Sequence, residues 1–194
     1  MFGGTFNPVH NGHVRLCRTL AEKISADRVI IVPAFSPVHK DTGKSLADAS
    51  DRMQMCELAF DGDNETVSDI EISQGRPCYS FETLERLHEM YPDSRLYMAC
   101  GSDMFLTLHS WRSPEKIYAL ATVCVMSRGD DCSLLCEYEK AHRADGLNAL
   151  IVDMPPVKIS STQVRAAVRA GESIDALVPP KVAQYIAQRR LYLC

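Results

Sequence analysis

The amino-acid sequence predicts an α/β fold built on a doubly wound parallel sheet, with a small helical portion at the C-terminal end. Short apolar runs, typical of buried strands, alternate along the chain with segments whose apolar residues recur at helical spacing. The run at 28–32 (RVIIV) is apolar after its first residue and is stopped by Pro33, as expected of a strand covered on both faces. In such a sheet, ligands bind at the carboxyl ends of the strands.

The first part of the chain predicts a very short strand at 1–2, followed by a helix over 13–25. Residues 34–49 are polar and form a long loop, and long loops are often functional. Ser50 is placed to cap a helix that runs to about Phe60. Residues 67–72 alternate apolar and polar side chains, which predicts a half-exposed strand.

The second part continues the same alternation, with helices over 80–91, 113–121 and 134–142 and strands over 96–100, 122–126 and 149–152. The segment SSTQ at 160–163 has the spacing of a capping box and predicts the start of a helix that Gly171 stops. A last helix opens at Pro179 and Pro180 and ends near Arg190. Because no linker interrupts the chain, we expect one domain over 1–194, with 160–194 as its C-terminal helical part.

Composition excludes several classes of function. The chain is 46% hydrophobic, which suffices for an ordinary core, and its net charge is −4, so extended binding to nucleic acid is not expected. Phosphate recognition must then be local. No apolar run reaches the length of a membrane span, and no targeting segment opens the chain, so we expect a cytoplasmic protein without a membrane partner. The eight cysteines include no Cys-x-x-Cys pair and are expected to be small buried hydrophobes.

The most informative segment is GGTFNPVHNGH at 3–13. Two adjacent glycines follow an apolar stub, a proline sets a turn, and His10 and His13 stand where a helical apolar pattern begins. This order is that of a strand, a glycine turn and a helix N-terminus. Backbone N–H groups and the helix dipole favour an anion there, most often a phosphate, and the imidazoles add side-chain donors.

The same residues leave two other roles open for the histidines. His-x-x-His can chelate zinc, but no third and fourth ligand follows at a recognisable spacing, so no metal-binding residue is expected. A purely structural role is a second alternative. The surrounding glycines favour the close approach of a ligand instead.

Two further segments could meet a phosphate. The segment SPVHK at 36–40 follows the second strand, and Lys40 is a point charge on a flexible stem, although a loop lysine is commonly only solvated. In ISSTQVR at 159–165, the first-turn N–H groups form an anion site and Arg165 can fork onto phosphate. An ordinary helix cap is the alternative for that segment.

Two residues of the stretch 101–111 remain open between structural and functional roles. Asp103, after Gly101 at a strand end, either caps a helix or bonds a ribose hydroxyl. Trp111, the only tryptophan, either packs in the interior or stacks on a flat heterocycle.

Together these segments resemble one family. GGTFNPVHNGH is similar to the histidine-containing signature of the nucleotidyltransferase superfamily, whose fold is Rossmann-like. The segments SPVHK, YSFETL (79–84), GSDMFLTLHSW (101–111) and ISSTQVR resemble, in this order, those of the nicotinate mononucleotide adenylyltransferases. The resemblance covers nearly the whole chain.

The resemblance implies an enzyme that transfers the adenylyl group of ATP to nicotinate mononucleotide, with Mg²⁺, and gives nicotinate adenine dinucleotide and pyrophosphate. It implies that the catalytic residues are His10, His13, Lys40 and Arg165. It implies contacts with ATP from Gly3, Gly4, Thr5, Phe6, Gly12, Gly101, Asp103, Ile159, Ser160 and Ser161. For the mononucleotide it implies Lys40, Tyr79, Ser80 and Trp111.

Two departures from the family pattern leave other functions open. Asn7 stands where the signature has an aspartate, and the first strand is shorter than usual. The rival functions are a related adenylyl- or cytidylyltransferase with another phosphomonoester acceptor, and a nucleotide-binding protein without turnover. The long stretch between Gly101 and Ser160 argues against the shorter relatives.

Overall fold

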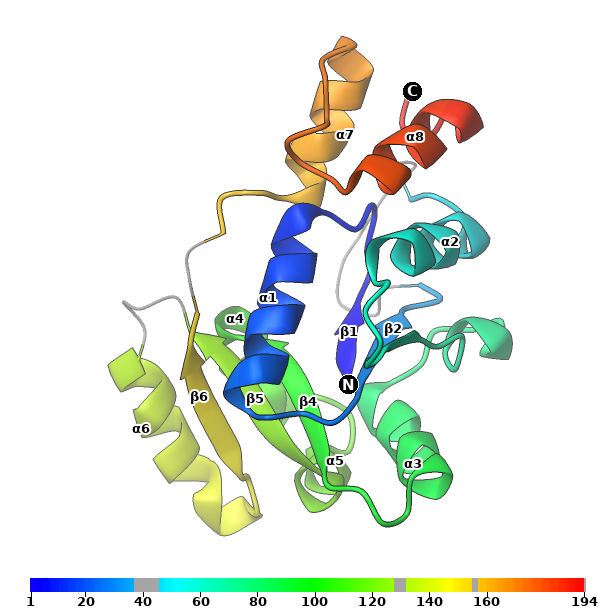
Figure 1. Ribbon diagram of the computed structural model, residues 1–194. Coiled ribbons are helices and arrows are strands. Elements are labelled where there is room, and N and C mark those ends of the chain that lie inside the picture. Colours follow the sequence, from blue (N-terminus) through cyan, green and yellow to red (C-terminus); the bar gives the residue numbers. More distant parts are fainter. Residues whose placement is uncertain (37–45, 128–131, 155–156, 194) are drawn as a thin grey trace. The chain divides into compact units, whose positions relative to one another are not determined.

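The computed structural model describes residues 1–36, 46–127, 132–154 and 157–193 (Figure 1). They form two compact units. Each unit combines helices with a β-sheet, in keeping with the α/β class that the sequence predicts. The amino-terminal unit contains Gly3–Pro77 and Val157–Cys194, and the central unit contains Met1–Phe2 and Cys78–Pro156. The segment after residue 156 therefore folds with residues 3–77.

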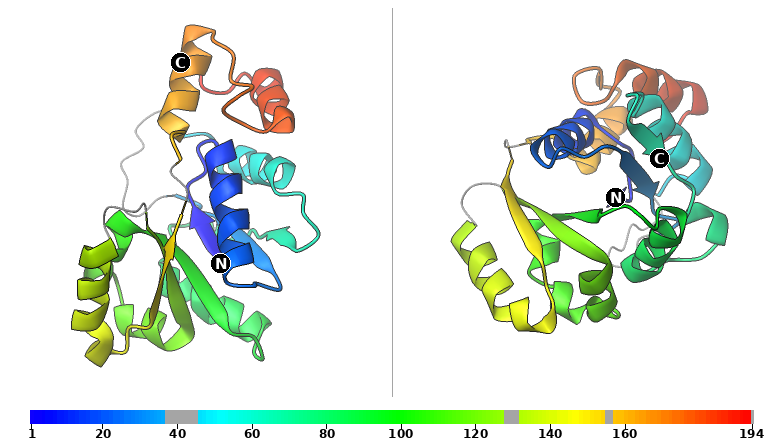
Figure 2. Two further views of the ribbon diagram at one scale, coloured as in Figure 1. Left: turned by 60° about the vertical axis from the view of Figure 1, so that its left-hand side comes forward. Right: turned by 60° about the horizontal axis from the view of Figure 1, so that its bottom comes forward.

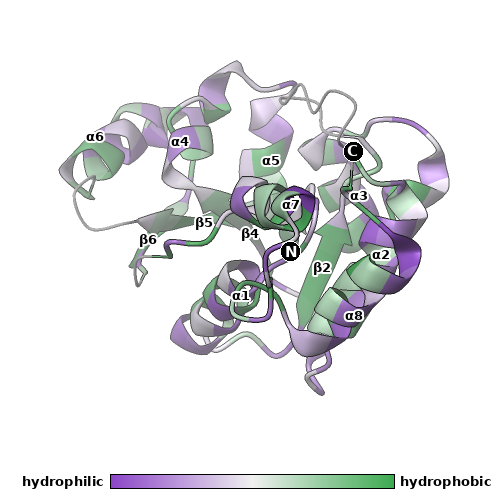
Figure 3. Cartoon of the chain, turned by 90° about the horizontal axis from the view of Figure 1, so that it is seen from above, coloured by the Kyte–Doolittle hydropathy of each residue, from purple (hydrophilic) through white to green (hydrophobic). Residues whose placement is uncertain are grey.

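The amino-terminal unit is built on a three-stranded sheet of order β1-β2-β3, with β1 at Phe2–Gly4, β2 at Val29–Pro33 and β3 at Glu65–Val67. β2 and β3 are parallel, with Val29 opposite Glu65 and Ile31 opposite Val67. All five residues of β2 are buried, and the strand is coloured as hydrophobic in Figure 3. The helices of this unit are α1 (Asn11–Lys23), α2 (Ala49–Ala59), α7 (Ser161–Ala170) and α8 (Pro180–Arg189).

The central unit has a parallel sheet of order β4-β5-β6, with β4 at Leu96–Gly101, β5 at Ala121–Ser127 and β6 at Ala149–Asp153. Its helices are α3 (Ser80–Met90), α4 (Ser102–Phe105), α5 (Pro114–Leu120) and α6 (Cys132–His142), and α6 lies along β6 (Figure 2). Each of these helices contributes a fully buried side chain to one core, namely Leu84, Phe105, Ile117 and Leu135. The central strand β5 adds Val123 and Val125.

Most elements lie where the apolar pattern predicts them, and two predicted helix starts are confirmed in detail. The Ser160 side chain accepts a hydrogen bond from the Gln163 N–H, and the Gln163 side chain accepts one from the Ser160 N–H, so the capping box is present. Gly171 ends α7 with φ of 70°, a left-handed conformation that glycine adopts without strain. Pro180 opens α8.

Two local predictions are wrong. The strand expected over 67–72 ends at Val67, because the Ser68 N–H makes the last ladder bond, to the Ile31 carbonyl, and the Ser68 hydroxyl then accepts the Ile70 N–H in a turn. Ser50 does not cap the following helix. The helix α2 begins at Ala49, with Asp48 at the cap position.

The cysteines behave largely as expected of small hydrophobes. Among the seven that the structure describes, all are free thiols and five are buried, namely Cys17, Cys56, Cys78, Cys100 and Cys124. None of the described helices combines the length and apolar character that a membrane crossing requires.

Candidate functional site

The signature histidines form a reciprocal pair at the start of α1. This helix begins at Asn11, two residues earlier than predicted, with His10 at the cap position. The His13 N–H donates to Nδ1 of His10, and the His10 N–H donates to Nδ1 of His13, both at 3.3 Å. The two rings stack, with centroids 3.7 Å apart and an interplanar angle of 21°.

This arrangement assigns the tautomer of both rings. An imidazole nitrogen that accepts an N–H bond carries no proton, so each neutral ring carries its proton on Nε2. Burial lowers the pKa of His10 from 6.5 to about 4, so this ring is neutral at physiological pH. The His10 ring therefore offers an Nε2–H donor instead of an imidazolium charge.

The residues around the pair hold it in place. Phe6 is almost fully buried, and its ring packs edge-on against His13 with centroids 5.1 Å apart. Gly12 is also buried, and a Cβ there would lie 2.4 Å from Cγ1 of Val157 and 2.9 Å from Nδ1 of His10. Close packing alone therefore requires glycine at position 12.

The start of α7 contacts the signature loop directly. The Ser161 hydroxyl donates to the Pro8 carbonyl at 2.9 Å, and Nη1 of Arg165 donates to the Asn7 carbonyl at 2.7 Å. The structure thus brings two of the predicted segments, 3–13 and 159–165, together in the amino-terminal unit. The N–H groups of the first turn of α7 have no partner within the helix, as at any helix start.

Arg165 has unused hydrogen-bonding capacity. Besides the Asn7 carbonyl, its guanidinium bonds the Thr162 hydroxyl through Nη2 at 3.2 Å. Its Nε is buried and has no hydrogen-bond partner among the described residues. A buried donor without a partner is costly, so this nitrogen is a candidate contact for an anionic ligand.

The departure at Asn7 has a structural explanation. The side chain is buried, and its Oδ1 accepts hydrogen bonds from the Ala47 N–H at 3.1 Å and from the Tyr192 hydroxyl at 2.9 Å. A neutral amide serves these donors without placing a charge in the interior. The Asn7 side chain thus ties the loop to the C-terminal segment.

The sequence did not single out Arg52, which is fully buried. Its guanidinium donates to the carbonyls of Thr5, Ala34 and Phe35, and its Nε donates to the Ala47 carbonyl. Burial lowers its pKa from the ordinary value. Arg52 therefore holds the turn after β1 beside the chain that leaves β2, and no local pattern signals a bond to carbonyls so far away in sequence.

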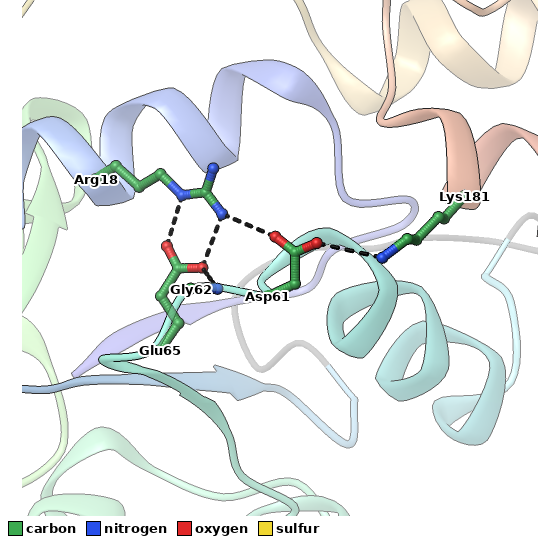
Figure 4. Close-up of polar contacts among 5 residues, drawn as sticks. All are labelled: Arg18, Asp61, Gly62, Glu65 and Lys181. Carbon is green, nitrogen blue, oxygen red and sulfur yellow. Dashed lines mark hydrogen bonds and ion pairs between the residues drawn. The ribbon is translucent and has the colours of Figure 1, made fainter.

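An ion-pair network holds the middle of α1 (Figure 4). Arg18 bonds Glu65 at 2.7 Å and Asp61 at 3.3 Å, and Asp61 also pairs with Lys181 of α8 at 3.3 Å. Arg18 holds the pKa of Glu65 below its usual value. The network joins three elements of the unit around the helix that carries the histidines.

The remaining predicted residues fall into two groups. Lys40 lies outside the described residues. The residues expected at the pyridine ring (Tyr79, Ser80 and Trp111) and at the adenosine (Gly101 and Asp103) lie in the central unit. Tyr79 precedes α3, and Ser80 is its first residue. The alternative of a capping role for Asp103 is wrong, because Gly101 is at the cap position of α4 and Asp103 is exposed inside that helix. Trp111 is partly buried against the core of the central unit.

The chain is similar to known proteins over its whole length. The cytidylyltransferase-like family model matches residues 1–167. A probable nicotinate-nucleotide adenylyltransferase of Desulfatibacillum aliphaticivorans is 35% identical and covers 100% of this chain and 98% of its own length. One with the same designation from Neisseria meningitidis serogroup B is 34% identical, with 99% and 96% covered.

Solved structures share the fold. The nicotinic acid mononucleotide adenylyltransferase of Plasmodium falciparum, complexed with NaAD, superposes with a TM-score of 0.76 at 18% identity, covering 98% of this chain and 95% of that one. A putative nicotinate-nucleotide adenylyltransferase from Vibrio parahaemolyticus gives a TM-score of 0.68 at 21% identity, with 99% and 93% covered. With its full-length relatives and its paired histidines, the chain belongs to the cytidylyltransferase-like family and, within it, to the nicotinate-nucleotide adenylyltransferases.

Proposed function

We propose that this protein transfers the adenylyl group of ATP to nicotinate mononucleotide and releases pyrophosphate, which makes it an enzyme of NAD biosynthesis. The observation that carries the proposal is the joining of the histidine pair, the start of α7 and Arg165 around one loop. The full-length relatives named for this reaction support the choice of substrates.

The protein needs to supply little covalent chemistry for this reaction. The attacking phosphomonoester is already an anion near neutral pH, so neither a protein nucleophile nor a strong base is required. The obstacle is repulsion between two polyanions, since two like charges about 4 Å apart cost on the order of 4 kcal/mol at an effective dielectric near 20. The residues must therefore align the substrates and stabilise the charge that develops.

The amino-terminal unit supplies groups suited to the triphosphate. We assign Nε2–H donation to His10 and His13, with His13 stabilising the charge that grows as pyrophosphate leaves and His10 orienting the triphosphate. Arg165 contributes one cation, and Lys40 a second one. Each donor of this kind, when it points at developing charge, lowers the activation barrier by roughly 3–4 kcal/mol.

The other substrate contacts are assigned to backbone turns and to the central unit. Gly3, Gly4, Thr5, Phe6 and Gly12 shape the turn next to the phosphates. We propose that Ile159, Ser160 and Ser161 present the first-turn N–H groups of α7, that Gly101 and Asp103 meet the adenosine, and that Tyr79, Ser80 and Trp111 meet the pyridine end.

The described residues contain no group of three histidine, cysteine or carboxylate side chains that could hold a metal ion. The Asn7 oxygen, at the position of the signature aspartate, already accepts two hydrogen bonds. These residues do not fit a metal site of the protein's own, so we propose that Mg²⁺ enters with ATP as part of the substrate. The seven described free thiols are consistent with a proposed cytoplasmic location.

Measuring pyrophosphate release tests the proposal. Purified protein is incubated with Mg²⁺ and ATP and with a panel of acceptors: nicotinate mononucleotide, nicotinamide mononucleotide, phosphopantetheine and glycerol 3-phosphate. A parallel reaction uses CTP in place of ATP. Rapid release with ATP and nicotinate mononucleotide is expected. A preference for another acceptor would support a related transferase, and ATP binding without release under any condition would support a protein without turnover.

A further inference from the structure

The central unit carries a row of two aromatic rings flanked by two cations. Tyr79 and Phe81 stack, with ring centroids 6.2 Å apart and an interplanar angle of 15°. The guanidinium carbon of Arg112 lies 5.3 Å from the centroid of the Tyr79 ring, and Nζ of Lys116 lies 4.9 Å from that of Phe81. Both contacts are within the range of cation–π attraction.

The two cations differ in their electrostatic partners. Lys116 forms an ion pair with Glu85 at 2.8 Å, which neutralises its charge locally. Arg112 is exposed and has no carboxylate within 4 Å among the residues that the structure describes. Its position on the Tyr79 ring is therefore set by the aromatic face, and its N–H groups remain available to an anion.

The backbone around Arg112 is fixed. The Trp111 N–H donates to the Leu108 carbonyl at 3.0 Å, and Ser113, with φ of 51°, accepts the Lys116 N–H at 3.1 Å at the start of α5. Arg112 thus stands between the only tryptophan and a tight turn.

We propose that Arg112 is the residue that makes the enzyme prefer the acid over the amide form of the mononucleotide. The inference rests on the proposed function, in which Tyr79 and Trp111 meet the pyridine ring. A guanidinium can donate two parallel hydrogen bonds to a carboxylate. A carboxamide offers one acceptor oxygen and turns its own NH₂ group toward the same donors, so it loses both charge attraction and a bond.

The test compares kcat/KM for the nicotinate and nicotinamide mononucleotides in the wild type and in Arg112→Gln, Arg112→Lys and Lys116→Gln. Arg112→Gln is expected to lower kcat/KM for the acid roughly 10- to 100-fold, mainly through KM, and to change that for the amide less than about threefold. Arg112→Lys should restore part of the preference, since it keeps the charge. Lys116→Gln is the matched control, because it removes the other cation of the row and should leave the acid-to-amide ratio unchanged.

A binding measurement separates recognition from turnover. Trp111 is the only tryptophan, so quenching of its fluorescence by nicotinate mononucleotide reports binding next to position 112. The wild type should bind the acid more tightly than the amide, and Arg112→Gln should bind the two equally, with an unchanged thermal unfolding midpoint.

The two levels of failure are distinguishable. A wild type that releases no pyrophosphate from ATP with nicotinate mononucleotide overturns the proposed function. An active wild type without a preference for the acid, or an Arg112→Gln variant that keeps the full preference, overturns the role of Arg112 alone.

Discussion

At the scale of single residues, the mutual bonding of His10 and His13 decides what the signature can do. Each Nδ1 accepts the other residue's backbone N–H, so each neutral ring presents Nε2–H. The low pKa of His10, about 4, keeps its ring neutral where enzymes ordinarily work. In the proposed function, positive charge toward the triphosphate comes from Arg165 and Lys40, while the imidazoles supply directed hydrogen bonds.

The buried state of His10 predicts how stability depends on pH. Because the pKa of His10 is lowered from 6.5 to about 4, the unfolded chain binds this proton more readily than the folded one. The contribution of the neutral His10 ring to the free energy of unfolding is therefore complete above pH 6.5, and it is lost as the pH falls toward 4. His10→Asn keeps an acceptor at the helix cap but cannot titrate.

Urea unfolding at a series of pH values measures this effect. The free energy of unfolding of the wild type should fall, relative to that of His10→Asn, by on the order of 1.4 kcal/mol per pH unit between pH 6 and 4.5. A difference between the two proteins that stays constant over this interval would show that His10 titrates normally.

Asn7 gives a second prediction at this scale. Asn7→Ala leaves the Tyr192 hydroxyl and the Ala47 N–H without their acceptor, so it should lower the free energy of unfolding by about 1–3 kcal/mol. Tyr192→Phe removes one donor and leaves the Ala47 bond in place, so its cost should be smaller. Urea unfolding at pH 7 measures the free energy of unfolding of both variants. Equal stability of the wild type and Asn7→Ala would rule out a structural role for the Asn7 Oδ1.

At the scale of elements, α1 is held at its N-terminus and at its middle. Its N-terminus is capped by His10 and packed at Gly12 against Val157, and Arg18 in its second turn joins the ion-pair network with Glu65, Asp61 and Lys181. A helix held in this way keeps the histidine pair in one orientation. Such preorganisation is what a site for charge stabilisation requires.

The packing at Gly12 is testable by a pair of substitutions. Gly12→Ala places a Cβ 2.4 Å from Cγ1 of Val157, so it should lower the free energy of unfolding by roughly 1–3 kcal/mol. Combining it with Val157→Gly should recover part of that loss, measured against Val157→Gly alone. If Gly12→Ala is as stable as the wild type, the close contact does not exist in solution.

Elements are predictable from sequence where their signal is local. The apolar runs at β2, β4, β5 and β6 and the capping box at Ser160 carry their own signal, and all were predicted. The strand expected over 67–72 failed because alternating side chains also fit a turn, and only the Ser68 bonds distinguish the two.

At the site, the sequence identified the segments but not how they are held. The histidine signature and ISSTQVR were predicted to act together, and the structure places both around the loop at Asn7. The bonds of Asn7 to Tyr192 and of Arg52 to distant carbonyls join positions far apart in the chain, so no local pattern reveals them. The contact of Arg112 with Tyr79 also joins positions far apart in the chain, so the sequence does not reveal it.

At the scale of the whole molecule, the two compact units carry different parts of the proposed chemistry. The described residues assigned to the triphosphate belong to the amino-terminal unit, and those assigned to the adenosine and to the pyridine ring belong to the central unit. The amino-terminal unit combines two stretches that are distant in the chain. The signature loop and Arg165 can therefore meet only after the residues of the intervening unit have been synthesised.

The most direct test of the account is the turnover of His13→Ala, measured as pyrophosphate release at saturating ATP and nicotinate mononucleotide. The account predicts that kcat falls by on the order of 10²-fold or more while the protein stays folded, because one donor to the leaving pyrophosphate is lost. A folded His13→Ala protein with nearly wild-type kcat would contradict it.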